Sequence, residues 1–381
     1  MASTASNMIV GSPITIGSTP GSIVLTTNQD TAYVTNNGGG VSVVDLTTQQ
    51  VTTTIADSNL PTGITMSADD TTVYVANTKP SSITSIDTET NLATTTLLPS
   101  IGGGYGIAAA TNAPVIYMSA YSSSDQNVYV LDSATFAISN IIPTGSHNKG
   151  IALSPSGQQL WVAGDSSSSI HVISTATNTI IANIAVGNNP ERVHFAPGGA
   201  SAWVTNNGDG TVTVIDTTTL APIATYASGS LPFDVTLSAD GTRAYVSNSL
   251  GTPGSSATGT VTVLDTTTGA TVATITGFTM PDNLVIGPVS CQSVDTAPCK
   301  NATGAKKQAC VLAQLSKLGM PTATAKSYAF LGQFRNAQGK INLKTISKLC
   351  CRTNSAAALQ LRKSVIAGVQ ASGKNLSGLS V

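Results

Sequence analysis

One short phrase recurs six times along this chain: an aromatic residue, an aliphatic residue, two small polar residues and then a turn. The steps between successive copies are 41, 43, 44, 42 and 42 residues, and the copies begin at Tyr33, Tyr74, Tyr117, Trp161, Trp203 and Tyr245. A period in this range marks a repeat architecture. Because a repeat array counts as one unit, the length of 381 residues does not indicate several ordinary domains.

Each repeat divides into four short pieces. The first begins near a proline and alternates between apolar and polar residues, as in residues 61–67 and 232–238. The second is the aromatic phrase, the third alternates again, as in residues 212–216, and the fourth follows a Thr-rich turn. Alternation between turn signals predicts β-strands joined by hairpins. Four antiparallel strands in about 42 residues form the blade of a β-propeller.

The aromatic phrase also carries a family resemblance. Residues 33–36 read Tyr-Val-Thr-Asn, and residues 203–206 read Trp-Val-Thr-Asn. Over about residues 7–288 the sequence resembles the YVTN-repeat family of propellers, which takes its name from this phrase. The copies at Tyr117 and Trp161 depart from the pattern. The resemblance implies a cell-surface or envelope scaffold of the surface-layer type.

The number of blades depends on how the two ends of the array are counted. First strands are expected at seven places, near Pro20, Pro61, Gly104, Asn148, Pro190, Pro232 and Pro281, whereas second and third strands occur six times. Residues 8–16 read as an unpaired fourth strand. Combining strands from both termini would protect exposed edges. We therefore expect seven blades in preference to six.

Charge and cysteine divide the chain at about residue 290. Residues 1–290 hold 17 Asp and Glu against 4 Lys and Arg, a net charge of −13, and no cysteine. Residues 291–381 hold one acid against 13 bases, a net charge of +12, and all five cysteines. We expect a propeller domain over residues 1–290 and a basic domain over residues 291–381. Such asymmetry indicates a partner of opposite charge.

The basic domain has helical periodicity between residues 303 and 373, which predicts three or four helices. Its cysteines lack the spacing of zinc or haem motifs, so disulfides are favoured, and they are Cys291, Cys299, Cys310, Cys350 and Cys351. We expect Cys310 to pair with Cys350 or Cys351, and one thiol of the odd number is free or joins another chain. Disulfides favour a secreted, cell-surface or periplasmic location. From the polar first residues and the absence of a long apolar stretch we expect neither a signal peptide nor a membrane-spanning helix in this sequence.

The starts of the first strands are the best place for a binding site, because the innermost strands of a propeller line its central channel. Two of the four basic residues of the body, Lys149 and Arg192, fall there in adjacent blades. Together with Tyr105 and Phe233 they are candidates for binding an anion or a sugar.

The acidic residues at the same positions allow a second interpretation. Glu191, Asp234, Asp282 and Asn283 could form an oxygen site for Ca²⁺, as in lactonase-like propellers. The plainest interpretation is that all these charges are solvated turn residues or neutralise one another, and it is favoured over both kinds of site. No metal or other cofactor is therefore expected, and Ca²⁺ is the alternative.

Other chemistry lacks support in the sequence. The three histidines have no nucleophile motif beside them, and no glycine-rich nucleotide loop follows a strand. The Asp that recurs before the last turn of the repeats, as in Asp45 and Asp216, is expected to accept hydrogen bonds from turn N–H groups. The Asn that ends the aromatic phrase is expected to be structural for the same reason.

We therefore expect a non-catalytic scaffold for binding or assembly, whose basic domain docks on an acidic partner or on a neighbouring propeller. The partner is a protein, a second copy or an anionic envelope polymer, and nucleic acid is not favoured. The expected basic surface comprises Lys306, Lys307, Lys340, Lys344, Lys348, Arg352, Arg362 and Lys363. The alternatives are a metal-dependent, lactonase-like hydrolase at the channel mouth and a structural subunit of a filament or surface layer.

Overall fold

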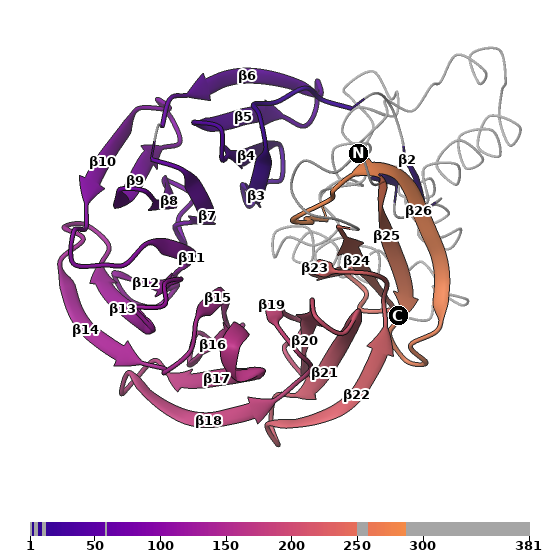
Figure 1. The fold of residues 1–381 in the computed structure, drawn as a ribbon. Coiled ribbons are helices and arrows are strands. Elements are labelled where there is room, and N and C mark those ends of the chain that lie inside the picture. The colour runs from indigo at the N-terminus through magenta and orange to yellow at the C-terminus, as the bar shows by residue number, and fades with distance from the viewer. Residues whose placement is uncertain (1, 4–6, 10–12, 58, 250–257, 287–381) are drawn as a thin grey trace, which may run out of the picture. The chain divides into compact units, whose positions relative to one another are not determined.

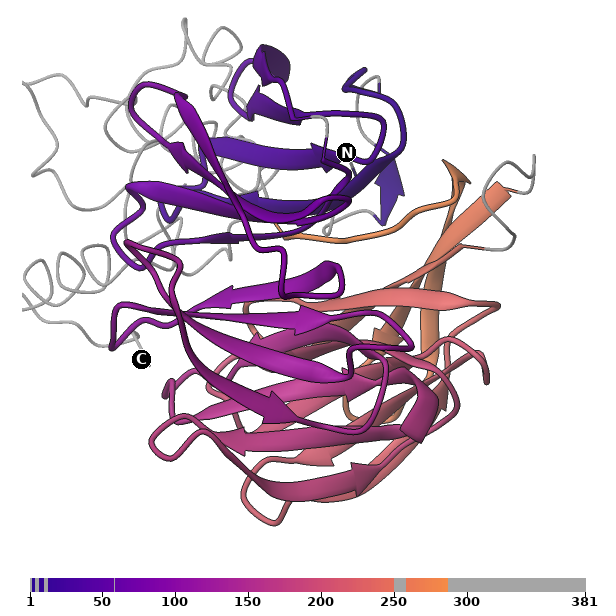
Figure 2. The same cartoon turned by 60° about the vertical axis from the view of Figure 1, so that its left-hand side comes forward.

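A computed structural model describes residues 2–3, 7–9, 13–57, 59–249 and 258–286. These residues form six four-stranded antiparallel sheets arranged as blades around a central channel (Figure 1). Figure 2 shows the same blades turned by 60°. The first strand of each blade is innermost and the fourth is outermost, so the all-β propeller fold expected from the sequence is confirmed.

The strands of the first three blades are β3 (Pro20–Leu25), β4 (Thr31–Asn36), β5 (Val41–Asp45), β6 (Gln50–Ile55), β7 (Pro61–Met66), β8 (Thr72–Thr78), β9 (Ser81–Asp87), β10 (Ala93–Leu97), β11 (Gly104–Ala109), β12 (Val115–Ala120), β13 (Asn127–Asp132) and β14 (Ile138–Pro143).

The strands of the last three blades are β15 (Asn148–Leu153), β16 (Gln159–Gly164), β17 (Ser169–Ser174), β18 (Thr179–Ala185), β19 (Pro190–Phe195), β20 (Ser201–Asn206), β21 (Thr211–Asp216), β22 (Ala221–Ala227), β23 (Pro232–Leu237), β24 (Arg243–Asn248), β25 (Thr258–Asp265) and β26 (Thr271–Thr279). A short 3₁₀ helix, η1 (Asp165–Ser167), follows β16. Two short strands near the N-terminus, β1 (Ala2–Ser3) and β2 (Met8–Ile9), pair with each other.

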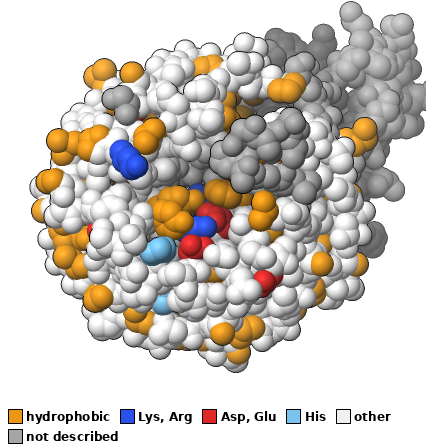
Figure 3. Space-filling view, viewed as in Figure 1, with side chains coloured by type: hydrophobic (Ala, Val, Ile, Leu, Met, Phe, Trp, Pro, Cys, Tyr) orange, Lys and Arg blue, Asp and Glu red, His pale blue; other side chains and the backbone are white. Residues whose placement is uncertain are grey.

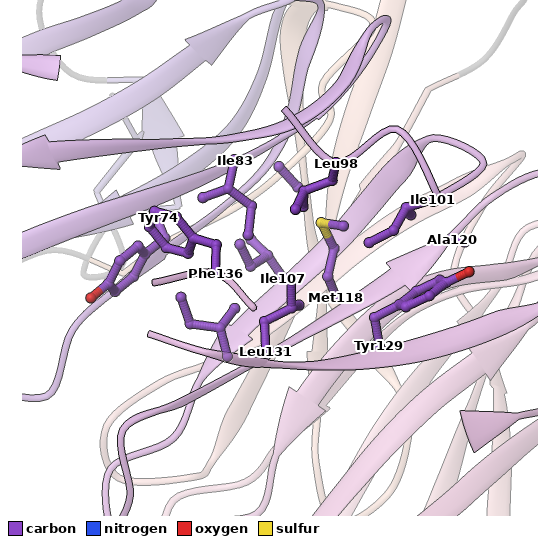
Figure 4. Close-up of a cluster of buried hydrophobic side chains, with 12 residues drawn as sticks. Tyr74, Ile83, Leu98, Ile101, Ile107, Met118, Ala120, Tyr129, Leu131 and Phe136 are labelled. Carbon is purple, nitrogen blue, oxygen red and sulfur yellow. The ribbon is translucent and has the colours of Figure 1, made fainter. Parts of the chain in front are cut away.

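Apolar side chains from adjacent blades pack against one another and form the core. The cluster between the second and third blades contains Tyr74, Ile83, Met118 and Leu131, with the rings of Tyr74 and Phe136 in an edge-to-face contact at 6.1 Å (Figure 4). The aromatic residue of the repeated phrase is buried in every blade. Its recurrence in the sequence therefore reflects packing between blades.

In four of the six blades the third residue of the repeated phrase joins the blade to the next inner segment, whereas blades two and four have alanine at this position. In blade five the Thr205 hydroxyl accepts the Arg192 N–H at 3.1 Å and donates to the Phe233 carbonyl at 2.9 Å in blade six. Thr35, Ser119 and Ser247 donate to the following inner segment in the same way. A small hydroxyl residue recurs here because two backbone groups of neighbouring inner strands need a partner.

The repeated Asp and Asn residues have the structural roles that were predicted. The Asp216 carboxylate accepts the N–H groups of Thr218 and Thr219 at 2.9 and 2.7 Å, and the Asp in the corresponding turn of four other blades accepts turn N–H groups likewise. The Asn206 amide is fully buried and donates to Thr213 Oγ1 at 2.8 Å. Both predictions are confirmed.

The prediction of a seventh blade was wrong, since the described residues form six. Residues 281–286 lie where a seventh inner strand would begin: Met280 has a left-handed φ of +47°, like Leu231 before β23, and Ser247 Oγ donates to the Asp282 carbonyl. Residues 13–17 precede blade one, where Ile14 and Ile16 pack against the cluster of Ala32, Val34 and Val44. No second or third strand lies beside either segment in the described ranges, so both remain irregular.

Several predictions concern residues beyond this description. The helical domain over residues 291–381, its cysteine pairing and its basic surface all lie outside the described residues. Residues 1–286 form one compact unit by themselves. No helix within the described ranges is long and apolar enough to cross a membrane.

Candidate functional site at the channel mouth

The starts of the inner strands converge at one end of the channel. In the face shown in Figure 3, charged and apolar side chains gather in a hollow at the centre of the ring. The second residues of successive inner segments from blade two onward are Thr62, Tyr105, Lys149, Glu191, Phe233 and Asp282. The repeat therefore brings together residues that lie about 42 positions apart.

Lys149 is neutralised by two carboxylates. Its Nζ lies 2.5 Å from Glu191 Oε2 and 3.2 Å from Asp165 Oδ1. Tyr105 OH donates to the other Glu191 oxygen at 2.8 Å. Burial lowers the pKa of Lys149, but Glu191 and Asp165 outweigh that effect and raise it. Burial, followed by the Glu191 charge, holds the pKa of Tyr105 well above its usual value, so this tyrosine stays protonated.

Arg192 is held mainly by aromatic faces. Its guanidinium carbon lies 5.3 Å from the ring centre of Tyr105 and 5.4 Å from that of Phe233, within the range of a cation–π interaction. Its Nη2 donates to Ser22 Oγ at 3.4 Å, a long hydrogen bond. Its Nε is buried and has no hydrogen-bond partner in the described part of the chain. No carboxylate there lies within 4.0 Å of the guanidinium.

Asp234 is 1% exposed and well supplied with donors. It lies 3.0 Å from His194 Nε2 and accepts the N–H groups of Val235 and Leu284 at 2.9 and 2.8 Å. Burial raises its pKa, but His194, Arg192 and the Leu284 N–H together lower it below the ordinary value. Asp234 is therefore an ionised anchor for the segment that follows blade six.

Asp282 differs from the other acids of the mouth. Burial raises its pKa to about 6, and the nearby Glu191 and Asp234 add to this effect, whereas Arg192 opposes it. The adjacent Asn283 contacts blade one, because its Nδ2 donates to the Gly21 carbonyl at 3.3 Å. The charge of Asp282 therefore changes within the range of mildly acidic pH.

The predicted calcium ligands do not form a shared coordination sphere. Glu191 contacts Lys149 and Tyr105, Asp234 contacts His194, and Asn283 contacts a backbone carbonyl. No group of three or more His, Cys, Asp or Glu in the described ranges is arranged to hold a metal ion. Glu191 and Asp234 already have partners, which leaves Asp282 as the one predicted carboxylate without a hydrogen-bond or ion-pair partner among the described residues, so the residues present fit Ca²⁺ poorly.

Four residues of this site were not predicted as ligand or metal candidates. Asp165 neutralises Lys149, and Tyr121 places its ring 5.7 Å from the Lys149 ammonium. His147 packs edge-on against Tyr121 at 5.8 Å, and His194 pairs with Asp234. His194 follows Arg192 by two positions on one strand, so strand alternation could have indicated it. Asp165 and Tyr121 follow second strands, where the repeat carries no such signal.

Comparisons with known proteins agree with the fold. The crystal structure of a functionally unknown protein from Desulfotomaculum acetoxidans DSM 771 matches with a TM-score of 0.63 and 17% identity, covering 72% of this chain and 90% of that chain. Hydrazine synthase of Kuenenia stuttgartiensis matches with a TM-score of 0.48 and 24% identity, over 54% of this chain and 63% of that chain. The first likeness supports a β-propeller.

Sequence comparison adds no family. None of the protein-family models matches this chain, and none of the curated protein sequences does. Membership of the YVTN-repeat family therefore remains a prediction that rests on the repeated phrase.

Proposed function

We propose that this protein is a non-catalytic binding propeller whose ligand site is the channel mouth. One observation carries the proposal: the Arg192 guanidinium lies between two aromatic rings and its buried Nε lacks a hydrogen-bond partner among the described residues. Lys149, by contrast, is neutralised by Glu191 and Asp165, and Asp234 has His194 and two backbone N–H groups as partners. Arg192 therefore retains hydrogen-bonding capacity for a ligand.

The chemistry of the mouth favours a small carboxylate that also carries hydroxyl groups, such as a sugar acid. A guanidinium binds a carboxylate through charge-assisted hydrogen bonds. Aromatic rings bind the apolar face of a sugar, and polar groups fix its orientation. Tyr105 and Phe233 supply rings beside Arg192, and Asp282 supplies a hydrogen-bonding group.

A calorimetric titration with glucuronate, and with glucose as the uncharged comparison, tests this proposal. We expect Arg192→Met to weaken glucuronate binding at least about tenfold, as loss of a charge-assisted bond does. Arg243→Met is the matched control, because Arg243 pairs with Asp265 away from the mouth. No glucuronate binding by the unchanged protein, or equal affinity in Arg192→Met, would refute the proposed site.

The catalytic alternative is tested separately. We do not favour a lactonase-like hydrolase, since two of the three carboxylates that would hold its metal, Glu191 and Asp234, have other partners. A calcium titration, with Asp234→Asn as the comparison, decides the matter. Heat of binding that disappears in Asp234→Asn would reinstate the metal site.

We further propose that the protein assembles through opposite charges, with its basic region on an acidic partner, which is a neighbouring propeller, another protein or an anionic envelope polymer. The support is the division between −13 in residues 1–290 and +12 in residues 291–381. Such attraction is screened by salt. We expect light scattering to show association at low salt that is lost at high salt. Association that does not change with salt concentration would contradict this mode of assembly.

A secreted, cell-surface or periplasmic location is part of the same proposal, and it rests on the five cysteines. Electrophoresis with and without a reducing agent, followed by peptide mapping, tests it. We expect disulfides within residues 291–381, and a thiol-sensitive ladder would favour the filament or layer subunit. Five reduced thiols in the native protein would contradict the oxidising location.

A further inference from the structure

The outermost strand of every blade lacks charge. The strands β6, β10, β14, β18, β22 and β26 contain no Asp, Glu, Lys or Arg, although residues 1–290 hold 17 acids. In Figure 3 the charged side chains of that face gather mainly in the central hollow, whereas the periphery is mostly uncharged. An edge strand presents unpaired backbone N–H and C=O groups, and proteins commonly protect such edges with charges or prolines.

Blade two has the edge best suited to pairing. Leu92 is 72% exposed and Leu97 is 61% exposed, and the four residues between them are Ala-Thr-Thr-Thr. This six-residue segment has no charge, glycine or proline, and three of its residues are β-branched, which favours strand pairing.

The other outer edges are less suitable. Proline interrupts β22 at Pro222 and ends β14 at Pro143. Strand β26 contains Gly277 and has β2 beside it, and β18 approaches β22. Strand β6 carries no exposed large apolar side chain. Among the described residues, strand β10 is therefore the most open of the six edges.

We infer that β10 is a self-association edge, which pairs antiparallel with β10 of a second copy. The propeller body carries a net charge of −13, so two bodies repel wherever their acidic turns meet. At the uncharged segment 92–97 two acidic bodies can meet without bringing like charges together, whereas a basic partner is drawn to the acidic turns instead.

Charge also selects the orientation of the pair. Asp87 ends β9, and Glu89 lies in the turn between β9 and β10. Parallel pairing would place the two acidic turns side by side, whereas antiparallel pairing places them at opposite ends. Antiparallel pairing of identical strands has two-fold symmetry and closes as a dimer. The pairing is independent of the channel mouth, and salt distinguishes it from assembly through opposite charges.

Sedimentation velocity of the full chain, with a reducing agent and at low and high salt, tests the pairing. We expect a dimer that persists at about 1 M salt, where surface charge attraction is screened. Leu97→Lys should raise the dimer dissociation constant at least about tenfold. Ile223→Lys is the matched control, because Ile223 is also 61% exposed on an outer strand but follows Pro222. This variant should leave the dimer unchanged.

Hydrogen exchange supplies a second readout in the unchanged protein. Amides of residues 92–97 that face outward should exchange more slowly as the protein concentration rises, whereas those of β22 should not. Three results would each overturn the inference: a monomer at about 0.5 mM, a dimer that persists in Leu97→Lys, or a dimer that dissociates at high salt. Loss of the dimer in salt would still leave the assembly through opposite charges intact.

Discussion

The burial of Asp282 gives the channel mouth an acid with a raised pKa. Burial raises its pKa from 3.8 to about 6, because the charged carboxylate loses its contact with water. The positive charge of Arg192 stabilises the carboxylate and offsets only part of this loss. Its neighbours Glu191 and Asp234 have partners that keep their charges satisfied. The mouth therefore contains one acid that is protonated in mildly acidic solution and charged in neutral solution.

The stability contributed by Asp282 should fall as the pH rises from about 4 to about 6. In this window the folded protein holds a proton on Asp282 that the unfolded chain has released, so folding binds protons. Asp282→Asn should therefore gain stability relative to the unchanged protein as the pH rises, reaching about 1–3 kcal/mol above pH 6. Urea unfolding of both proteins from pH 4 to 8 measures this difference. A difference that stays constant with pH would contradict the raised pKa.

At the scale of strands, the ring depends on hydroxyl groups that bridge neighbouring blades. Thr205→Val keeps the shape of the side chain but leaves the Arg192 N–H and the Phe233 carbonyl without their bridging partner. We expect a loss of about 1–3 kcal/mol in the free energy of unfolding. Thr225→Val on the exposed edge β22 is the control and should change stability by less than about 0.5 kcal/mol. Equal effects in urea unfolding would show that the bridge contributes little.

The strands were predictable because the sequence contains six copies of the same pattern. The six inner strands begin at the predicted residues, from Pro20 to Pro232. The prediction of a seventh inner strand at Pro281 was wrong. The local pattern of an inner strand was present there, but a pairing partner was absent from the described residues. A β-strand requires a neighbour, which its own sequence does not encode.

The site was only partly predictable for a related reason. The repeat indicated that Tyr105, Lys149, Arg192 and Phe233 share the channel mouth. It could not indicate that Lys149 pairs with Asp165 or that Arg192 lies against two rings, because these contacts depend on side-chain directions across the channel. Residues that depart from the repeat carry no periodic signal.

The whole ring has one weak junction. Between blades six and one the described residues place segment 281–286, which contacts blade one through the hydrogen bond from Asn283 to the Gly21 carbonyl. Elsewhere, complete sheets pack against each other. We expect the amides of blades three to five to exchange most slowly with solvent, and those of blades one and six to exchange faster. Equal protection of all six blades in native-state hydrogen exchange would contradict this account of the junction.

The central claim is that the channel mouth binds a carboxylate through Arg192 and that Asp282 opposes this binding when it is charged. Calorimetric titration with glucuronate at about pH 5 and about pH 7.5, with the unchanged protein and Asp282→Asn, tests the claim directly. Glucuronate stays ionised at both pH values, and the variant separates Asp282 from His194, which faces the same region. We predict that affinity falls with rising pH in the unchanged protein but largely persists in Asp282→Asn. Equal pH dependence in both proteins, or binding that does not vary with pH, would contradict it.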